Sequence, residues 1–142
     1  MANETIIAKG SYATIQATAN ISDNVLSAGT VTPIGTAIPS EALYPLLDLK
    51  LTVSTGTPVA GGTIDVYRRP SDGTNQSPLP VVGDFLTTYV GSFILDNALP
   101  TQYYYLYGIA NPDPNDTYYM YNNDGATLSI TLAARGRTYG TA

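Results

Sequence analysis

Two residue types that carry much of protein chemistry are missing from this 142-residue chain, which has no cysteine and no histidine. Without cysteine there can be no disulfide and no thiolate metal site. Without histidine the chain lacks the commonest metal ligand and the most frequent general base near neutral pH. A nucleophile would have to be a serine or threonine beside a lysine, or a carboxylate pair, and neither leaves a signature in the sequence.

Motifs that bind nucleotides, phosphate or calcium are missing as well. The sequence has no Gly-x-Ser-x-Gly elbow and no P-loop, and no predicted helix follows Gly61-Gly62 to hold a phosphate. The segment 111–116, NPDPND, could suggest a calcium loop, but it lacks the central glycine and final glutamate of an EF-hand. Asparagine and aspartate beside proline are typical turn residues. We therefore expect no enzyme, no cofactor and no metal site.

Charge is scarce, since only 12% of the residues are charged, about half the usual share. The net charge is −5. The six basic residues are scattered, apart from two close arginine pairs: Lys9, Lys50, Arg68, Arg69, Arg135 and Arg137. Nucleic-acid binding needs a basic stripe that neutralises phosphates, so we expect no nucleic-acid partner. A surface poor in charge indicates burial against another protein, because interface cores are depleted of charged residues.

Long apolar runs are absent too. No stretch approaches the ~18 apolar residues of a membrane span. The first ten residues, MANETIIAKG, lack the basic and apolar regions of a secretory signal. We therefore expect no membrane partner, and a chain that is made and kept in a cytoplasm until it is assembled or released. The length suits one domain, which at this size buries enough surface for a core without disulfides.

Alternation with a period of two dominates what is present. Apolar residues at 49, 51 and 53, and again at 64 and 66, alternate with polar residues or tyrosine that we expect to face water. Similar patterns predict short strands at residues 12–21, 47–54, 63–69, 87–95, 103–109, 117–121 and 126–132. Asp124-Gly125 predicts a hairpin between the last two. The only helix-like piece is 41–47, which is one turn at most or simply the approach to the next strand.

This pattern predicts an all-β chain with one antiparallel β-sandwich or jelly-roll domain. We place the domain at residues 12–132, preceded by an N-terminal arm (1–11) and followed by a C-terminal tail (133–142), in which the apolar period is lost.

Tyrosine is strongly over-represented, with twelve residues against two phenylalanines and no tryptophan. Seven lie on two strands close in sequence, at positions 103, 104, 105, 107, 118, 119 and 121. Tyrosine fits a half-buried sheet surface, with its ring on the core and its hydroxyl at the rim. It also suits a protein interface, because it adds contact area at little entropic cost. A sugar platform made of Tyr103, Tyr105, Tyr107 and Tyr119 is a third reading, although such platforms usually include tryptophan.

Both arginine pairs lie at the ends of elements, where they are either solvated charge or contacts to a negatively charged partner. Ile6 and Ile7 form a small apolar plug in the arm. The candidate partner-binding residues are Ile6, Ile7, Arg68, Arg69, Tyr103, Tyr105, Tyr107, Tyr119, Arg135, Arg137 and Tyr139.

Four segments resemble the small β-sandwich virion proteins of tailed bacteriophages. They are LLDLKLTV (46–53), GGTIDVYRRPSDGTN (61–75), YVGSFIL (89–95) and YNNDGATLS (121–129). The resemblance covers roughly residues 12–135, and the chain departs from it in the tyrosine run at 103–107 and in the NPDPND turn.

The resemblance implies a β-sandwich on the capsid surface of a virion, most often a decoration or cement protein. Such a protein binds and stabilises the major capsid protein lattice as a homo-oligomer, for example a trimer. A tail or head–tail connector protein shares the fold, and a glycan-binding surface module is an alternative of a different class.

Overall fold

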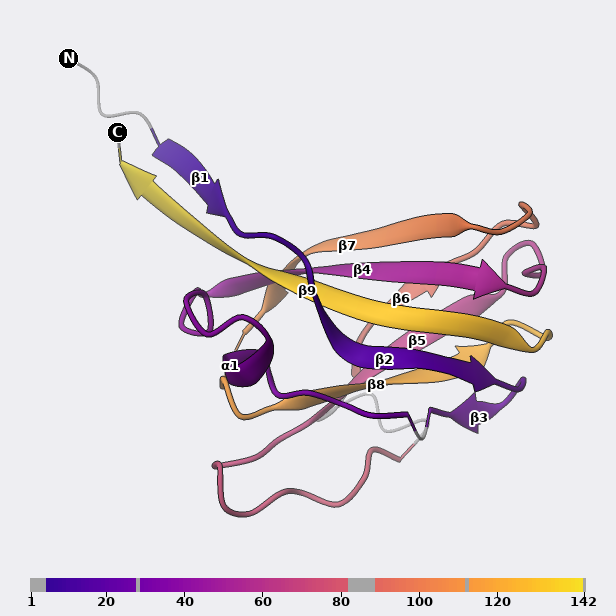
Figure 1. Cartoon of the computed structure of the whole chain (residues 1–142), viewed down its shortest axis with the longest axis horizontal. Helices are drawn as coiled ribbons and strands as arrows, with labels where there is room; N and C mark the ends of the chain where they lie inside the picture. Colours follow the sequence, from indigo (N-terminus) through magenta and orange to yellow (C-terminus); the bar gives the residue numbers. More distant parts are fainter. Residues whose placement is uncertain (1–4, 28, 82–88, 112, 142) are drawn as a thin grey trace.

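Two antiparallel sheets face each other in the computed structural model of the chain, which describes residues 5–27, 29–81, 89–111 and 113–141 (Figure 1). The predicted all-β sandwich is confirmed. The first sheet runs in the order β1 (Thr5–Lys9), β9 (Leu128–Thr141), β4 (Leu46–Thr55), β7 (Gln102–Ala110). A fifth strand, β2 (Ala13–Ile21), pairs with β9 on the same edge as β1. The second sheet runs β3 (Val25–Leu26), β8 (Thr117–Asn123), β5 (Thr63–Arg69), β6 (Tyr89–Ile94).

The core lies between the two sheets and is built from the alternating positions that the sequence pattern marks. All of the predicted apolar positions of β4 and β5 are fully buried: Leu49, Leu51, Val53, Ile64 and Val66. The other main core residues are Ile15, Leu47, Phe93, Tyr118, Met120, Leu128, Ile130 and Leu132. In the first sheet, β9 and β4 are the central strands and β7 is an edge strand.

The second sheet departs from the prediction at β5, whose alternate residues were expected to face water. Tyr67 is 0% exposed and Asp65 only 8%. Ser92 donates a hydrogen bond to Asp65 (2.6 Å) and shares another with the Tyr89 hydroxyl (2.6 Å). Tyr67 packs edge-on against the Tyr89 ring, with centroids 5.8 Å apart. Alternation in β5 therefore separates an apolar buried face from a hydrogen-bonded one.

The predicted Asp-Gly hairpin is wrong, because β8 and β9 belong to different sheets. The buried Asn122 amide donates to the carbonyl oxygens of Ile21 (2.8 Å) and Ala126 (2.7 Å). The Asp124 carboxylate accepts the Val59 N–H at 2.9 Å. These side chains satisfy backbone groups from other parts of the chain, so the segment forms a corner between sheets instead of a tight turn.

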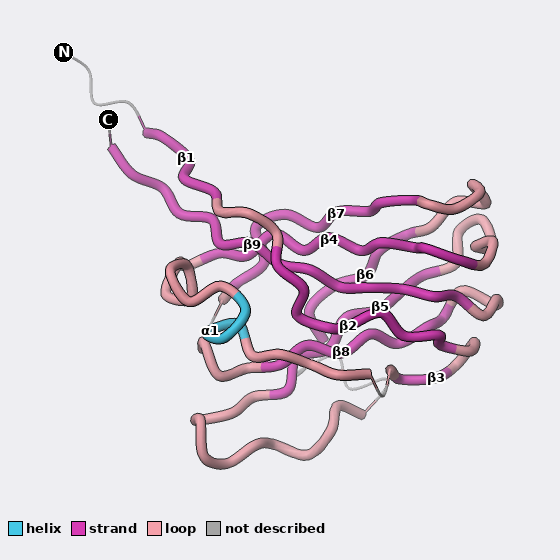
Figure 2. Tube along the Cα trace, in the orientation of Figure 1, coloured by secondary structure: helices cyan, strands magenta, loops and turns pink. Residues whose placement is uncertain are grey.

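Residues 41–47 are the approach to β4, one of the two structures expected for them, and the helix of the described residues is the short α1 (Ile34–Ala37) just before them (Figure 2). The Thr36 and Ala37 N–H groups both donate to the Pro33 carbonyl oxygen at 3.0 Å. The Glu41 carboxylate accepts the Gly136 N–H at 2.6 Å. No helix among the described residues has the length and apolar character needed to cross a membrane.

The predicted C-terminal tail is mostly the second half of β9, which remains in the sheet opposite β4 as far as Arg137. Its apolar period is lost because the inner position at Gly136 has no room for a side chain. A Cβ atom there would lie 2.6 Å from the Glu41 Cβ and 2.7 Å from the Tyr44 ring. The predicted N-terminal arm contains β1, which pairs with the last residues of β9. We call β1 with residues 137–141 the ribbon; it projects beyond the sandwich (Figure 1).

Candidate binding face on the first sheet

The outer side of the first sheet gathers tyrosines at its β7 edge. Tyr103, Tyr105 and Tyr107 are 53%, 44% and 57% exposed. Tyr104 and Leu106, which alternate with them, pack against the core. Alternate residues of β7 therefore face the outside and the core. The result is a row of three rings along the edge of the sheet.

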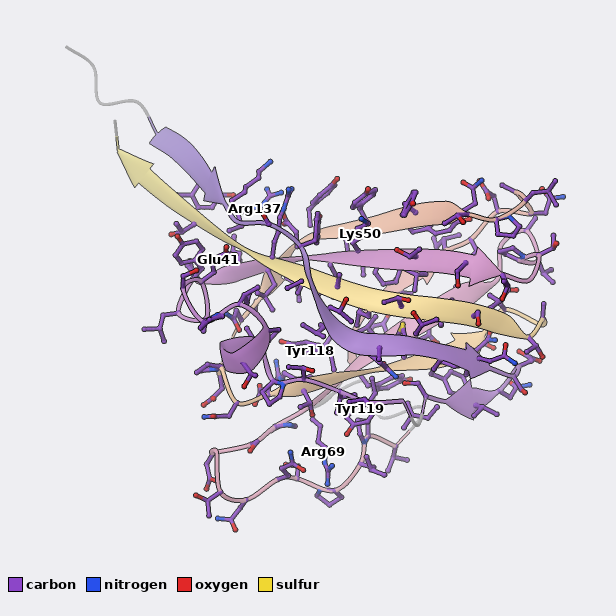
Figure 3. The ribbon with its side chains drawn as sticks, viewed as in Figure 1. Glu41, Lys50, Arg69, Tyr118, Tyr119 and Arg137 are labelled. Carbon is purple, nitrogen blue, oxygen red and sulfur yellow. The ribbon has the colours of Figure 1, made fainter. Side chains whose placement is uncertain are left out.

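Cations from the neighbouring strands lie over these rings. The register places Lys50 of β4 opposite Tyr105, and its Nζ lies 4.9 Å from the Tyr103 ring centroid. The Arg137 guanidinium lies 5.3 Å from the Tyr107 ring centroid. Lys50 and Arg137, labelled in Figure 3, come from the two central strands of the sheet. Such cation–π contacts stabilise both partners and restrict where the side chains can lie.

A further ring extends the face from the start of β2. The Tyr12 ring lies 4.6 Å below the Arg135 guanidinium and is tilted against Tyr105 at 6.0 Å. Tyr105 and Tyr107 stack almost in parallel, with ring centroids 5.9 Å apart. Burial raises the pKa of Tyr12, although the nearby Arg135 charge acts against this. We call the set Tyr12, Lys50, Tyr103, Tyr105, Tyr107, Arg135 and Arg137 the tyrosine–cation face.

Asp48 lies beneath this face and holds its two arginines. Its side chain is 0% exposed and forms ion pairs with Arg135 Nε and Arg137 Nε, each at 2.9 Å. It also accepts the Gly108 N–H at 3.2 Å. Burial alone would raise the pKa of Asp48, but hydrogen bonds from Arg137, Arg135 and Gly108 outweigh it and hold the pKa below its ordinary value. The carboxylate thus stays ionised and fixes both guanidinium groups.

Gly108 makes this arrangement possible at the backbone. The pairing of β4 with β7 shifts by one residue between Leu47 and Leu49, which leaves a bulge opposite Asp48. Gly108 lies in this bulge with φ +69°, a conformation that glycine adopts without strain. Its N–H is turned to the Asp48 carboxylate instead of a strand partner.

The charge of the face is opposite to that of the chain. Lys50, Arg135 and Arg137 contribute three positive charges and Asp48 one negative, which gives +2 on a chain of −5. The described residues include no group of three or more acidic side chains that could hold a metal ion. The face can therefore bury aromatic surface against a partner and attract negative charge.

The structure brings together five of the predicted partner-binding residues: Tyr103, Tyr105, Tyr107, Arg135 and Arg137. Tyr119 lies apart from them on β8 of the second sheet and is only 7% exposed. The predicted platform of four tyrosines is therefore not formed, because Tyr119 faces a different layer. Tyr139 pairs with Ile7 in the ribbon, where Ile6 pairs with Gly140.

The other arginine pair is used to fold loops. Arg68 forms an ion pair with the buried Asp116 at 3.3 Å. Arg69 donates from Nε to the Ser77 carbonyl oxygen at 2.7 Å, tying the following loop to the end of β5 (Figure 3). The side chains of both arginines make contacts within the chain, although each is partly exposed.

Tyr12 and Lys50 belong to the face and Asp48 lies beneath it, but none of the three was predicted as a site residue. Lys50 and Asp48 occupy the polar positions of the alternating β4 pattern, so the sequence indicates that their side chains lie on the side of the sheet opposite the core. What the sequence does not show is that β4 lies between β7 and β9, which begin only at Gln102 and Leu128. Tyr12 carries no signal beyond its place as the first residue of the predicted strand 12–21.

A polar cleft of about 580 Å³ opens between the loop after β5 and the loop before β8. Its lining includes Arg68, Ser71, Asp72, Asn75, Asp113 and Asp116. The carboxylates are already occupied: Asp72 accepts the Thr74 and Asn75 N–H groups, and Asp113 accepts the Asn115 N–H. Burial raises the pKa of Asp116, although it accepts the Ser71 N–H and faces Arg68. These acids shape the loops and leave the tyrosine–cation face as the better candidate site.

No protein-family model matches the chain, and no curated protein matches it at a significant level.

Proposed function

We propose that this chain is a structural protein of a tailed-phage virion, a capsid decoration or cement protein that binds the major capsid protein lattice. The observation that carries the proposal is the tyrosine–cation face: three exposed tyrosines on one edge strand, held by cations and a buried carboxylate. The four sequence segments that resemble virion proteins support the same assignment.

The order of the rings supports binding to a protein surface. Tyrosine contributes contact area with few rotatable bonds, and rings that are already fixed lose less entropy when a partner covers them. Tyr105 and Tyr107 are stacked on each other, and Arg137 lies over Tyr107. On a capsid lattice, many weak copies of such a contact would act together, because linked sites raise the effective concentration of each other.

The experiment uses particles of the phage that encodes the chain, purified and analysed by mass spectrometry and cryo-electron microscopy. We expect the protein on the capsid surface with the tyrosine–cation face against the major capsid protein. Its absence from the particle overturns the proposal, and density on the tail would make it a tail or head–tail connector protein instead.

A variant tests whether this face is the one used. Tyr105→Ala should lower the amount of protein that rebinds to particles stripped of it, because it removes the central ring of the row. Leu43→Ala is the matched control, since Leu43 is 87% exposed and lies outside the face. Equal rebinding of both variants would show that another surface makes the contact.

A glycan-binding module is the second candidate, favoured by the row of exposed rings at 103, 105 and 107. Rings spaced along a strand can stack on successive sugars. A glycan array, followed by tyrosine fluorescence titration with any sugar that binds, tests this function. If the protein binds capsids but neither the array nor the titration shows sugar binding, the glycan-binding function is rejected and the virion role stands.

A further inference from the structure

The ribbon is a two-stranded element that continues past the sandwich. β9 pairs with β4 only as far as Arg137, whereas β1 pairs with β9 from Arg137 to Thr141. Among the described elements, only β9 makes substantial contact with β1. Two strands alone are marginally stable in water, and a third strand is normally needed. The outer edge of β1 therefore has no strand partner among the described residues.

A second open edge lies on the opposite side of the same sheet. β7 is its terminal strand and pairs only with β4 in the part of the chain that the structure describes. It is nine residues long, QYYYLYGIA, with no charged residue and no proline. Soluble proteins usually protect long edges with lysine, proline, bulges or a covering segment, because an open edge pairs with other chains.

The other edges of the sandwich have such protection or are short. β2 has register shifts on both sides of Gln16, and Gln16 itself forms a bridge with Val31. In the second sheet, β3 has two residues and β6 has six. Among the strands that the structure describes, β7 is thus the longest edge without such protection, and the bulge at Gly108 lies near one of its ends.

We propose that β1 of one copy of this chain adds to the β7 edge of a second copy, so that the first sheet continues from molecule to molecule. The order would be β1-β9-β4-β7 of one copy, followed by β1-β9-β4-β7 of the next. Backbone hydrogen bonds would join the strands, as in other cases of strand addition. The inference rests on the two edges alone and does not depend on the capsid proposal.

A second copy is the occupant because each molecule supplies both halves of the contact. β1 is TIIAK, so only its last residue is charged, and β7 has no charge. Neither strand contains an acidic residue, so two chains of net negative charge can meet at these edges without bringing carboxylates together. Ile6 and Ile7 are β-branched, and β-branched residues pair well with aromatic residues across strands. Because the edges differ, the contact is head-to-tail and generates a ring or a filament.

Disulfide trapping tests the proposal cleanly, because the chain has no cysteine of its own. Ile7→Cys protein is mixed under mild oxidation with Tyr103→Cys, Tyr105→Cys or Tyr107→Cys protein, each purified separately and checked for folding by circular dichroism. A disulfide needs Cα atoms within about 7 Å, so one of the three positions should react best. Thr74→Cys, on an exposed loop, is the control partner.

We expect a mixed dimer of Ile7→Cys with one β7 variant to form about tenfold faster than with the loop control, because binding raises the local thiol concentration. A chain that carries both cysteines should give a ladder of disulfide-linked oligomers on oxidation. Sedimentation velocity of the native chain should show the same oligomers without oxidation. Homodimers of Ile7→Cys alone would show β1–β1 pairing, and homodimers of a β7 variant alone would show β7–β7 pairing. Either result overturns the proposal. So does mixed-dimer formation at the rate of the loop control together with a monomer in sedimentation velocity. None of these measurements involves a capsid, so failure here is separate from failure of the virion assignment.

Discussion

At the scale of single residues, Asp48 determines the geometry of the tyrosine–cation face although its side chain is itself completely buried. It joins three strands, because it lies on β4, binds two arginines of β9 and accepts a backbone N–H from β7. A buried carboxylate is stable only when charges and hydrogen bonds compensate for the loss of water. Here they do so while leaving the far side of each guanidinium over a tyrosine ring.

Asp48→Asn should lower the free energy of unfolding at neutral pH by about 3 kcal/mol, since removing the carboxylate leaves two partly buried arginines without their counter-charge. The effect has a defined pH dependence. The pKa of Asp48 is lowered in the folded state from 3.8, so its stabilisation is complete above pH 3.8 and is lost as pH falls through the folded pKa. Urea denaturation over this range should therefore show a steeper loss at low pH for the native chain than for the variant.

Asp96→Asn is the control for this measurement, because Asp96 is exposed and an amide oxygen can still accept the Tyr104 hydroxyl that donates to it at 2.8 Å. It should lose far less stability at neutral pH than Asp48→Asn does. An Asp48→Asn variant with native stability, or with an unchanged slope below pH 3.8, would mean that the arginines are satisfied by solvent instead.

At the scale of elements, most strands were predictable from the sequence, whereas β1, β3, the second half of β9 and the pairing of the strands were not. A period of two is a local signal, and β5 has the predicted bounds 63–69. Pairing depends on contacts between distant residues, such as the Asn122 amide with the Ile21 carbonyl oxygen 101 positions away. The Asp-Gly signal favours a hairpin only when no such contact competes. The same reason explains why the tyrosines of β7 were predicted as site residues, whereas the position of Lys50 and Arg137 over their rings was not.

Gly108→Ala tests the bulge that turns an N–H toward Asp48. An added Cβ meets nothing within 4 Å, so steric crowding is not the issue. The cost comes from φ +69°, which disfavours alanine by about 1–2 kcal/mol. Thermal or urea denaturation measures it, with Gly108→Asn as the matched variant, because asparagine tolerates the left-handed region better. Equal destabilisation by both variants would contradict a conformational origin.

At the scale of the whole molecule, folding gathers on one side positive charges that are scattered along the sequence. Lys50, Arg135 and Arg137 meet on the first sheet, and Lys9 pairs in register with Arg137 at the base of the ribbon. Four of the six basic residues thus lie on one side of a chain with net charge −5. Sequence composition could indicate a charge-poor surface but could not locate this positive pole, because it depends on the register of β4, β7 and β9.

The ribbon also divides the molecule by local stability, which hydrogen exchange can measure. β1 and β2 pair with the same edge of β9, but β2 packs on the core through Ile15 and Ile21 whereas β1 lies beyond it. In dilute protein we expect β1 amides to exchange orders of magnitude faster than β2 amides, because local opening costs less where little apolar surface is buried. At high concentration, protection should rise in β1 and β7 together and stay unchanged in β2. Equal protection of β1 and β2 in dilute protein would show that the ribbon is stable alone and has no need of a third strand.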